Sequence, residues 1–512
     1  MRKRISACGG LAAMAALAGS AVAVSIGGVA SAESAHAVNA GTLTLGGAFA
    51  TASFNPWLAP AGDNEYLQVE GAVYDSLTHI AGNGRIEPGL ATSWKYVNPK
   101  TLVLTLRTGV TFTDGKPVNA QAVAANFAYV KHASPAGQEN AFIAALTTKV
   151  LSSTKLQVTS STPDPNLPYD FATGGGFIVN PQALKHPATL ATKPAGSGPY
   201  VLTSFTAGQQ WNFTRRSHYW DQSEYPYSKL VIKSFASTQA EDDALLSGQI
   251  QGAPDTAQLA PDDSARGLRV ERSTPLGFDA IWLSDRAGKI VPALGSALVR
   301  EAMNYAIDRP LLIAAVDGQY GKPGSLVAPP GQPGYSASED SFYTYDLSKA
   351  KQLLAQAGYG KGFTLPILST PVADPLVEAV AGMLSKVGIT LQISDHTTDF
   401  LSQLYSGNWA ASVFAWTPEP MAQGLQELLS PDGLGNFNHS TNPTIEAMLA
   451  KVGKLTGAAQ TAELGKLVDY VNQQAWFLIP GYNDNLYVTG PKTTCTLGQT
   501  PLCQLYSFRP VS

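Results

Sequence analysis

The sequence predicts an α/β protein built from more than one lobe. Segments with the alternating apolar pattern of strands are interleaved with segments whose apolar residues recur every three or four positions, as in helices. Without a predicted leader (residues 1–37), the 512-residue chain is still longer than the roughly 250–300 residues that one hydrophobic core usually serves. No internal repeat and no low-complexity linker interrupts it.

A strand, a turn and a helix are marked most clearly over residues 102–130. Residues 102–107 place leucine on one face and valine, threonine or arginine on the other. Asp114-Gly115 predicts a tight turn. Asn119 is a favourable N-cap for a helix whose apolar stripe covers residues 123–130. The unit has no catalytic group, so we interpret it as scaffold.

The remaining elements carry similar signals. Asp346 caps a helix that Gly358 ends, and Asp308 precedes a helix with proline in its first turn. Further strands are predicted over 42–47, 201–216 (a pair) and 389–393, and further helices over 65–77, 241–246, 297–307, 377–387 and 463–475.

The N-terminus has the pattern of a secretory signal peptide. A basic start at Arg2–Arg4 precedes the apolar run Leu11–Val24, which is shorter than the about 20 residues that span a bilayer. Small-x-small sites predict cleavage after Ala32 or Ala37. An N-terminal membrane anchor is the alternative.

A lipid anchor is not expected. Ile5–Cys8 is similar to a bacterial lipobox, but it precedes the apolar run, so cleavage there would leave that run on the mature chain. We therefore interpret Cys8 as incidental and expect an exported, soluble product in the periplasm or at the outer face of the cell membrane.

The charge balance argues against polyanionic partners. Removing residues 1–32 leaves 31 Lys and Arg against 38 Asp and Glu, a net charge of −7. A mildly acidic surface gives no support for binding nucleic acid or anionic membranes. Charged residues make up 14% of the chain, below the roughly 25% that is usual for soluble domains.

Two cysteines remain after the leader, Cys495 and Cys503, and a disulfide is expected between them in an oxidising compartment. A metal pair and free thiols are the alternatives. The pair has no nearby histidine, no third cysteine and no Cys-x-x-Cys spacing, which argues against metal.

The motifs of common secreted hydrolases are missing. The chain has no Gly-x-Ser-x-Gly elbow and no His-Glu-x-x-His helix. The cluster Asp395–Asp399 contains one histidine and is interpreted as a solvated loop rather than a metal site. Gly174–Gly176 lacks the Lys-Ser/Thr ending of a phosphate loop. We expect no catalytic residue, no metal and no cofactor.

Five motifs in order resemble one family. They are VYDSLTHIAGNGRIEPGLATSWKY, LRTGVTFTDGKPVNAQAV, GSGPYVLTSF with RRSHYW, VREAMNYAIDRPLLI with GQYGKPG, and YDLSKAKQLLAQAGY. Over essentially the whole mature chain, the sequence resembles the extracytoplasmic solute-binding proteins of ABC transporters, family 5, which bind dipeptides, oligopeptides or nickel.

The resemblance implies a two-lobed periplasmic-binding-protein-like fold, class II, large type, with an extra subdomain in the first lobe. The chain is then expected to cross twice between the lobes. The implied first lobe covers residues 38–275, with the extra subdomain at about 58–195. The second lobe covers 276–482, and residues 483–512 return to the first.

The resemblance also implies the function. We expect a monomeric receptor that closes around a small solute and delivers it to membrane permease subunits with their ATPase. An oligopeptide is the leading ligand, followed by an oligosaccharide and then by nickel chelates or other amphipathic solutes. A secreted hydrolase is the alternative of another class.

One motif bears directly on the ligand. Peptide-binding relatives hold the free amine with the carboxylate of Trp-x-x-Asp, and the match here is Trp416-Thr417-Pro418-Glu419. Glu419 keeps the charge of that anchor. Alternatively, a short deletion aligns Glu419-Pro420 with a later Asp-Pro of the relatives, and the anchor is then lost.

Other cleft-lining candidates are aromatic or amide residues near the lobe junctions. Ordinary core packing is the alternative for each aromatic residue. Main-chain groups are expected to contribute much of a peptide site, because an extended peptide pairs like a strand. The candidates are Phe54, Asn55, Trp57, Trp282, Trp416 and Tyr482.

Overall fold

The predicted leader, with its cleavage sites and Cys8, lies outside the residues that the structure describes, and so does Glu419. Among the helices of the described residues, none combines the length and the apolar character that a membrane crossing requires. The computed structural model describes residues 40–47, 53–58, 66–82, 84–132, 143–396, 399–417, 420–498, 500 and 502–511.

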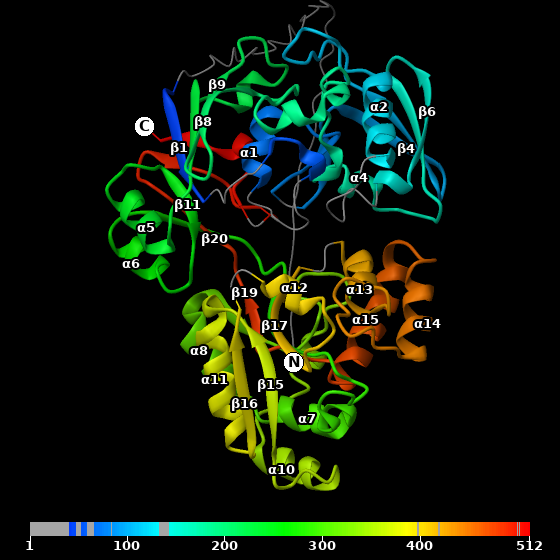
Figure 1. Ribbon diagram of the computed structural model, residues 1–512, viewed down its shortest axis with the longest axis vertical. Helices are drawn as coiled ribbons and strands as arrows, with labels where there is room; N and C mark the ends of the chain where they lie inside the picture. Colours follow the sequence, from blue (N-terminus) through cyan, green and yellow to red (C-terminus); the bar gives the residue numbers. More distant parts are fainter. Residues whose placement is uncertain are drawn as a thin grey trace, which may run out of the picture. The chain divides into compact units, whose positions relative to one another are not determined.

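A seven-stranded sheet lies along one side of the first lobe, at the left in Figure 1. β1 (Thr42–Gly46) runs parallel to β10 on one side and to β11 on the other, and the outer pairs are antiparallel. Leu43 and Leu45 are buried, as the alternating pattern predicted. The strand order is β12 (Arg269–Arg272), β20 (Leu486–Thr489), β11 (Gly252–Asp255), β1, β10 (Lys229–Lys233), β9 (Gln210–Arg215) and β8 (Tyr200–Thr206).

A four-stranded antiparallel sheet with α2 (Ala120–His132) contains the predicted strand, turn and helix, drawn in blue and cyan in Figure 1. Asn119 Oδ1 accepts a hydrogen bond from Ala122 N at 2.9 Å, so the predicted N-cap is confirmed. Gly115 takes φ +80° in the turn, a conformation that suits glycine. The sheet order is β4 (Ala91–Asn98), β5 (Thr101–Leu106), β7 (Lys155–Thr159) and β6 (Thr147–Ser152).

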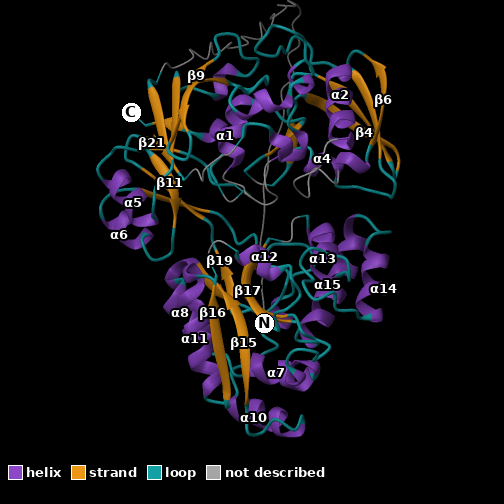
Figure 2. Ribbon diagram, viewed as in Figure 1, coloured by secondary structure: helices purple, strands orange, loops and turns teal. Residues whose placement is uncertain are grey.

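A five-stranded sheet is the centre of the second lobe and is covered by helices on both faces (Figure 2). Successive side chains of its central strand β13 (Phe278–Leu283) alternate between two cores. Ile281 and Leu283 pack in one core with helices from residues 297–385, whereas Phe278 and Trp282 pack in the other with helices from residues 421–473. The strand order is β16 (Ile389–Asp395), β15 (Phe363–Ser369), β17 (Ala411–Trp416), β13 and β18 (Phe477–Leu478).

The helices of the second lobe were predicted in part. Asp346 Oδ1 caps α10 by accepting from Lys349 N at 2.9 Å, and Gly358 follows that helix with φ +87°, as expected. No helix was predicted at α13 or α14. The helices are α7 (Ala297–Tyr305), α8 (Arg309–Val316), α10 (Leu347–Gln356), α11 (Asp374–Ser385), α13 (Met421–Leu429), α14 (Pro443–Val452) and α15 (Gly457–Gln473).

The helix predicted over residues 65–77 is shorter in the structure. It is α1, Tyr66–Val73. The following residues leave the helix because the groups that would pair within it serve other segments: Val73 O accepts from Gly198 N at 3.0 Å, and Leu77 N donates to Gly176 O at 3.1 Å. Tertiary hydrogen bonds therefore override the helical spacing there.

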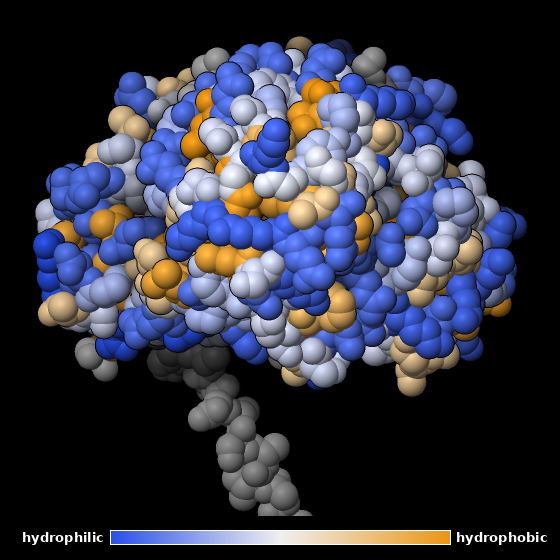
Figure 3. Space-filling view, turned by 90° about the horizontal axis from the view of Figure 1, so that it is seen from below, coloured by the Kyte–Doolittle hydropathy of each residue, from blue (hydrophilic) through white to orange (hydrophobic). Residues whose placement is uncertain are grey.

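The chain crosses between the two large sheets twice. It leaves the seven-stranded sheet after β12 and enters the five-stranded sheet at β13; it returns through β19 (Gly481–Asn483), which pairs with β14 (Gly321–Pro323), into β20. The α/β prediction, with two lobes and two crossings, is confirmed. Figure 3 views the molecule from the end that carries the second lobe, where hydrophilic side chains enclose smaller hydrophobic patches.

The C-terminal segment is tied to the first lobe. Cys495 and Cys503 form a disulfide, with their Cα atoms 6.1 Å apart. Gln68 Nε2 of α1 donates to Cys503 O at 2.7 Å. Both cysteines are buried in the first-lobe core, so this loop is part of the packing around α1.

Replacing both cysteines (Cys495→Ala with Cys503→Ala) is expected to lower the free energy of unfolding by roughly 2–3 kcal/mol, since the crosslink restricts the unfolded chain. Urea unfolding of the oxidised protein and of the variant measures the difference. The single variant Cys495→Ala, which also lacks the crosslink, is the matched control and should lose a similar amount. Equal stability of double variant and parent would contradict a stabilising crosslink.

Candidate functional site

Two cavities lie where the chain crosses between the sheets. The larger, of about 720 Å³, is called the hinge cavity and is lined by β11, β13, β17, β19 and the C-terminal end of α8. The smaller, of about 140 Å³, is called the α1 cavity and is lined by the end of α1, by residues after α4 (Leu167–Asp170) and by residues near 500–506. Asn485 lines both. Ligands of open α/β sheets bind at the carboxyl ends of parallel strands, so the hinge cavity is the first candidate.

β17 extends beyond its neighbour on one side. β13 pairs with it from Ala411 to Trp416, but β15 pairs with it only at Ala411 and Ser412. Within the described chain, residues 413–415 therefore have a partner strand on one edge only. The same three residues line the hinge cavity.

β11 is also paired incompletely. β20 pairs with it from Gly252 to Asp255, whereas β1 pairs with it at Gly252 alone. Pro254, which has no N–H to donate, lies in the singly paired stretch, where a strand tolerates proline. Pro254 and Asp255 line the hinge cavity, so each large sheet offers it one half-paired strand.

The hinge cavity is acidic. Four carboxylates line it, and none of its described lining residues is Lys, Arg or His. Burial raises the pKa of Asp255 to about 6 and also raises the pKa of Asp279. Burial, and then the charge of Asp279, raises the pKa of Asp317 to about 6. Asp484 is the exception in having a cationic partner, Arg272.

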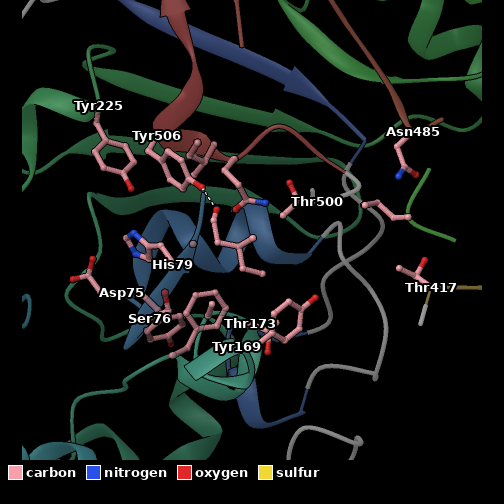
Figure 4. Close-up of a pocket in the computed structure, with 18 residues that line it drawn as sticks. Asp75, Ser76, His79, Tyr169, Thr173, Tyr225, Thr417, Asn485, Thr500 and Tyr506 are labelled. Carbon is pink, nitrogen blue, oxygen red and sulfur yellow. Dashed lines mark hydrogen bonds between the residues drawn. The ribbon is translucent and has the colours of Figure 1, made fainter. Parts of the chain in front are cut away.

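Aromatic and polar side chains enclose the α1 cavity (Figure 4). The His79 ring stacks on Tyr506, with centroids 5.8 Å apart and planes 10° from parallel. Tyr506 donates its hydroxyl to Ile80 O at 2.6 Å. Burial lowers the pKa of His79 to about 4, so the ring is neutral at pH 7 and serves as a polar but uncharged wall.

Asp75 lies at the border of the α1 cavity and joins α1 to the segment after β9. It accepts from the Tyr219 hydroxyl at 2.6 Å and from Trp220 Nε1 at 3.3 Å. Burial raises the pKa of Asp75 to about 6, although these hydrogen bonds and the nearby Arg216 act in the opposite direction. The carboxyl group therefore links the end of α1 to Tyr219 and Trp220, and burial disfavours its charged form.

Three of the candidate residues lie in the first-lobe core. Phe54, Asn55 and Trp57 are buried, and none of them lines either cavity. Tyr74 donates its hydroxyl to Phe54 O at 2.7 Å, and Trp57 N donates to Asn55 Oδ1 at 3.1 Å. In this conformation they shape the turn after β1, and ligand contact by them stays a prediction.

Trp282 and Trp416 lie in the second-lobe core. Trp282 is completely buried, and its Nε1 donates to Phe414 O at 3.0 Å. Trp416 is half-buried, with its ring centroid 5.8 Å from that of Trp282. Thr417, the next residue, reaches the α1 cavity. Glu419 lies outside the described residues, so its role also stays a prediction.

Tyr482 has a structural role in this conformation. It is 1% exposed, and its hydroxyl donates to Asp340 Oδ1 at 2.7 Å. The same hydroxyl accepts from Leu326 N at 3.0 Å. The side chain therefore ties β19 to residues 325–340 and presents no surface to either cavity.

Several cavity residues were missed in the sequence. Asp279 interrupts the apolar strand β13, and that interruption is the signal that could have identified it. Asp317 and Asn485 lie at a helix end and a crossing, where polar residues are common, so their pattern carried no signal. Within the described ranges, no group of three or more His, Cys, Asp or Glu is arranged to hold a metal ion.

Comparisons with known proteins agree with this architecture. The family model of bacterial extracellular solute-binding proteins, family 5 (middle), matches residues 85–435. The chain is 26% identical over 472 residues to heme-binding protein A of Haemophilus influenzae, covering 82% of this chain and 84% of that protein. It is 26% identical over 359 residues to the probable D,D-dipeptide-binding periplasmic protein of Escherichia coli K12, covering 66% of each.

A solved structure shows the same fold. The dipeptide-binding protein from Pseudoalteromonas sp. SM9913, in complex with Met-Leu, matches with a TM-score of 0.79 at 20% identity and covers 92% of this chain and 100% of that one.

Two lobes joined by two crossings, with cavities between their sheets, define a solute-binding receptor of an ABC importer. The chain belongs to family 5 of the bacterial extracellular solute-binding proteins. Members of this family are transport receptors rather than enzymes. We therefore interpret the two cavities of this chain as candidate binding sites.

The Asp75→Asn variant is expected to lose one part of the pH dependence of stability. Between the ordinary pKa of 3.8 and about 6, folded protein keeps a proton on Asp75 that the unfolded chain releases. The contribution of this residue to the free energy of unfolding therefore falls as pH rises through that window and is constant above it. Urea unfolding at a series of pH values compares parent and variant. A difference independent of pH would contradict the raised pKa.

Tyr482→Phe is expected to lower the free energy of unfolding by about 1–3 kcal/mol, because it removes one donor to the buried Asp340 and one acceptor for Leu326 N. Tyr335→Phe, at a half-buried tyrosine that also donates to Asp340, is the matched control and should cost less. Urea unfolding measures both. Unchanged stability with weaker ligand binding would instead place Tyr482 in the binding site.

Proposed function

We propose that this receptor captures oligopeptides in the hinge cavity and closes its lobes around them by a hinge motion. The bound peptide is then delivered to the permease subunits of an importer that an ATPase drives. The lobes in this proposal are residues 38–275, with the extra subdomain at about 58–195, and residues 276–482. Residues 483–512 complete the first lobe, and the receptor acts as a monomer.

The half-paired strands carry the proposal. Residues 413–415 of β17 and Pro254–Asp255 of β11 line one cavity from the two lobes, and each has a partner strand on one edge only in the described structure. An extended peptide supplies alternating N–H and C=O groups that can pair with such edges as an added strand. Free amino acids and most other small metabolites have no repeating main chain to do so.

The size and lining of the hinge cavity also suit a short peptide. Its volume, about 720 Å³, lies within the roughly 300–1,000 Å³ of typical ligand pockets. Leu376, Phe400 and Phe414 contribute apolar surface beside the carboxylates. Peptide side chains could therefore be accommodated while the main chain is held by the strands.

Relatives do not decide the ligand by themselves. Their names mention heme, D,D-dipeptides and glutathione. Oligosaccharides, the alternative from the sequence, are less supported because two of the aromatic cleft-lining candidates, Trp57 and Trp282, are buried. The amine anchor at Glu419 remains part of the proposal, and Glu419→Gln should weaken the binding of peptides with a free amino terminus.

Di- to pentapeptides are expected to raise the melting temperature of the purified protein, whereas maltotriose and hemin are not. A ligand at 100 times its dissociation constant stabilises by about 2.7 kcal/mol, enough for a clear shift. Peptides of the same sequence with N-methylated internal amides should bind more weakly, because they lack donors for the strand edges. Stabilisation by glycans but by no peptide would contradict the proposal.

A further inference from the structure

The hinge cavity contains negative charge without matching positive charge. Asp255, Asp279 and Asp317 line it, and none of the three forms an ion pair with a described Lys, Arg or His. Asp279 accepts one hydrogen bond, from Asn483 Nδ2 at 3.1 Å. Asp255 Oδ1 accepts from Thr256 N at 2.7 Å, while its Oδ2 is buried with no hydrogen-bond partner in the described structure.

The end of α8 adds to this negative potential. Val316 and Asp317, at its C-terminus, both line the cavity. A helix C-terminus carries about half a negative charge on its unpaired carbonyls, so a carboxylate there is unfavourable by itself. Gln258 Nε2 donates a hydrogen bond to one of these carbonyls, Val316 O, at 2.9 Å. A neutral amide does not cancel the charge of Asp317.

The fourth carboxylate shows what a compensated site looks like in this protein. Asp484 lines the same cavity but is paired with Arg272. Removing carboxylates from water is unfavourable unless a cation or several donors replace the water. The charge of Asp279, added to burial, raises the pKa of Asp317. One positive group between them would relieve both.

We propose that the solute carries an organic cation, an ammonium or guanidinium group, which Asp279 and Asp317 hold in the hinge cavity. This inference rests on the proposed capture of a solute in that cavity. The apolar side chains Ile313, Val413 and Leu376 share the lining with the carboxylates, so the cation belongs to an amphipathic molecule. Within peptides, two sources supply it: a free amino terminus or a Lys or Arg side chain.

The test measures dissociation constants by calorimetry for a matched set of probes. Acetyl-Ala-Lys-Ala-amide carries a side-chain cation only, Ala-norleucine-Ala-amide an amino-terminal cation only, and acetyl-Ala-norleucine-Ala-amide no charge. Acetyl-Ala-Glu-Ala-amide carries a negative charge, and cadaverine is a cation without a main chain. We expect at least one of the two singly cationic peptides to bind at least tenfold more tightly than the neutral and the acidic ones.

Charge-removing variants locate the contact. Asp279→Asn and Asp317→Asn should each weaken the binding of the cationic peptide at least tenfold. Each should also reduce the difference in affinity between the cationic and the neutral peptide. Asp432→Asn, at an exposed carboxylate outside both cavities, is the matched control and should change affinity less than twofold. Because burial disfavours both charges, the two variants should melt no lower than the parent, which separates lost binding from lost folding.

The outcomes separate this inference from the peptide proposal. Neutral and cationic peptides binding equally well, or affinity unchanged in both variants, would overturn the cation site and leave the peptide proposal standing. Cadaverine binding that depends on Asp279 and Asp317, without binding of any peptide, would support the cation site and overturn the peptide proposal. If no probe binds, both are overturned.

Discussion

Each lobe's sheet contains one strand that is incompletely paired where it faces the hinge cavity, and the arrangement of the candidate site depends on these two strand ends. A strand edge has main-chain donors and acceptors that must be hydrogen-bonded to protein, water or ligand. β17 continues past β15, and β11 diverges from β1, so the ends of both strands reach the hinge cavity half-paired. These half-paired ends line the hinge cavity, close to the points where the chain crosses between the lobes.

The buried carboxylates of the hinge cavity are a second constraint on the same site. Burial of Asp279 and Asp317 favours their protonated forms, and the C-terminus of α8 adds to the negative potential. Such an arrangement is unfavourable for the unliganded fold and is tolerated when a ligand completes it. In the proposed function, the strand edges determine how the main chain of a peptide lies, and the carboxylates select its charge.

The large aromatic residues near the crossings have a different task. Trp282 is completely buried, with its indole N–H bonded to Phe414 O, and Tyr482 joins Asp340 to the main chain at Leu326. These contacts tie β13 to β17 within the second-lobe sheet and β19 to residues 326–340. A two-lobed receptor needs rigid lobes so that motion is confined to the hinge. Large aromatic residues near the crossings can therefore support the fold around a binding site without contacting the ligand.

Local signals in the sequence determined the α/β class, the strand–turn–helix unit with its cap at Asn119 and the helix that begins after Asp346, because alternation, helical spacing and capping act within a few residues. The cavity depended on contacts between distant segments. Asp279 and Asp317 come together with Asn485 only when the two sheets and their crossings are assembled. The length of α1 and the partial pairing of β17 were decided in the same way, because hydrogen bonds between remote residues compete with local propensity and leave no periodic trace in the chain.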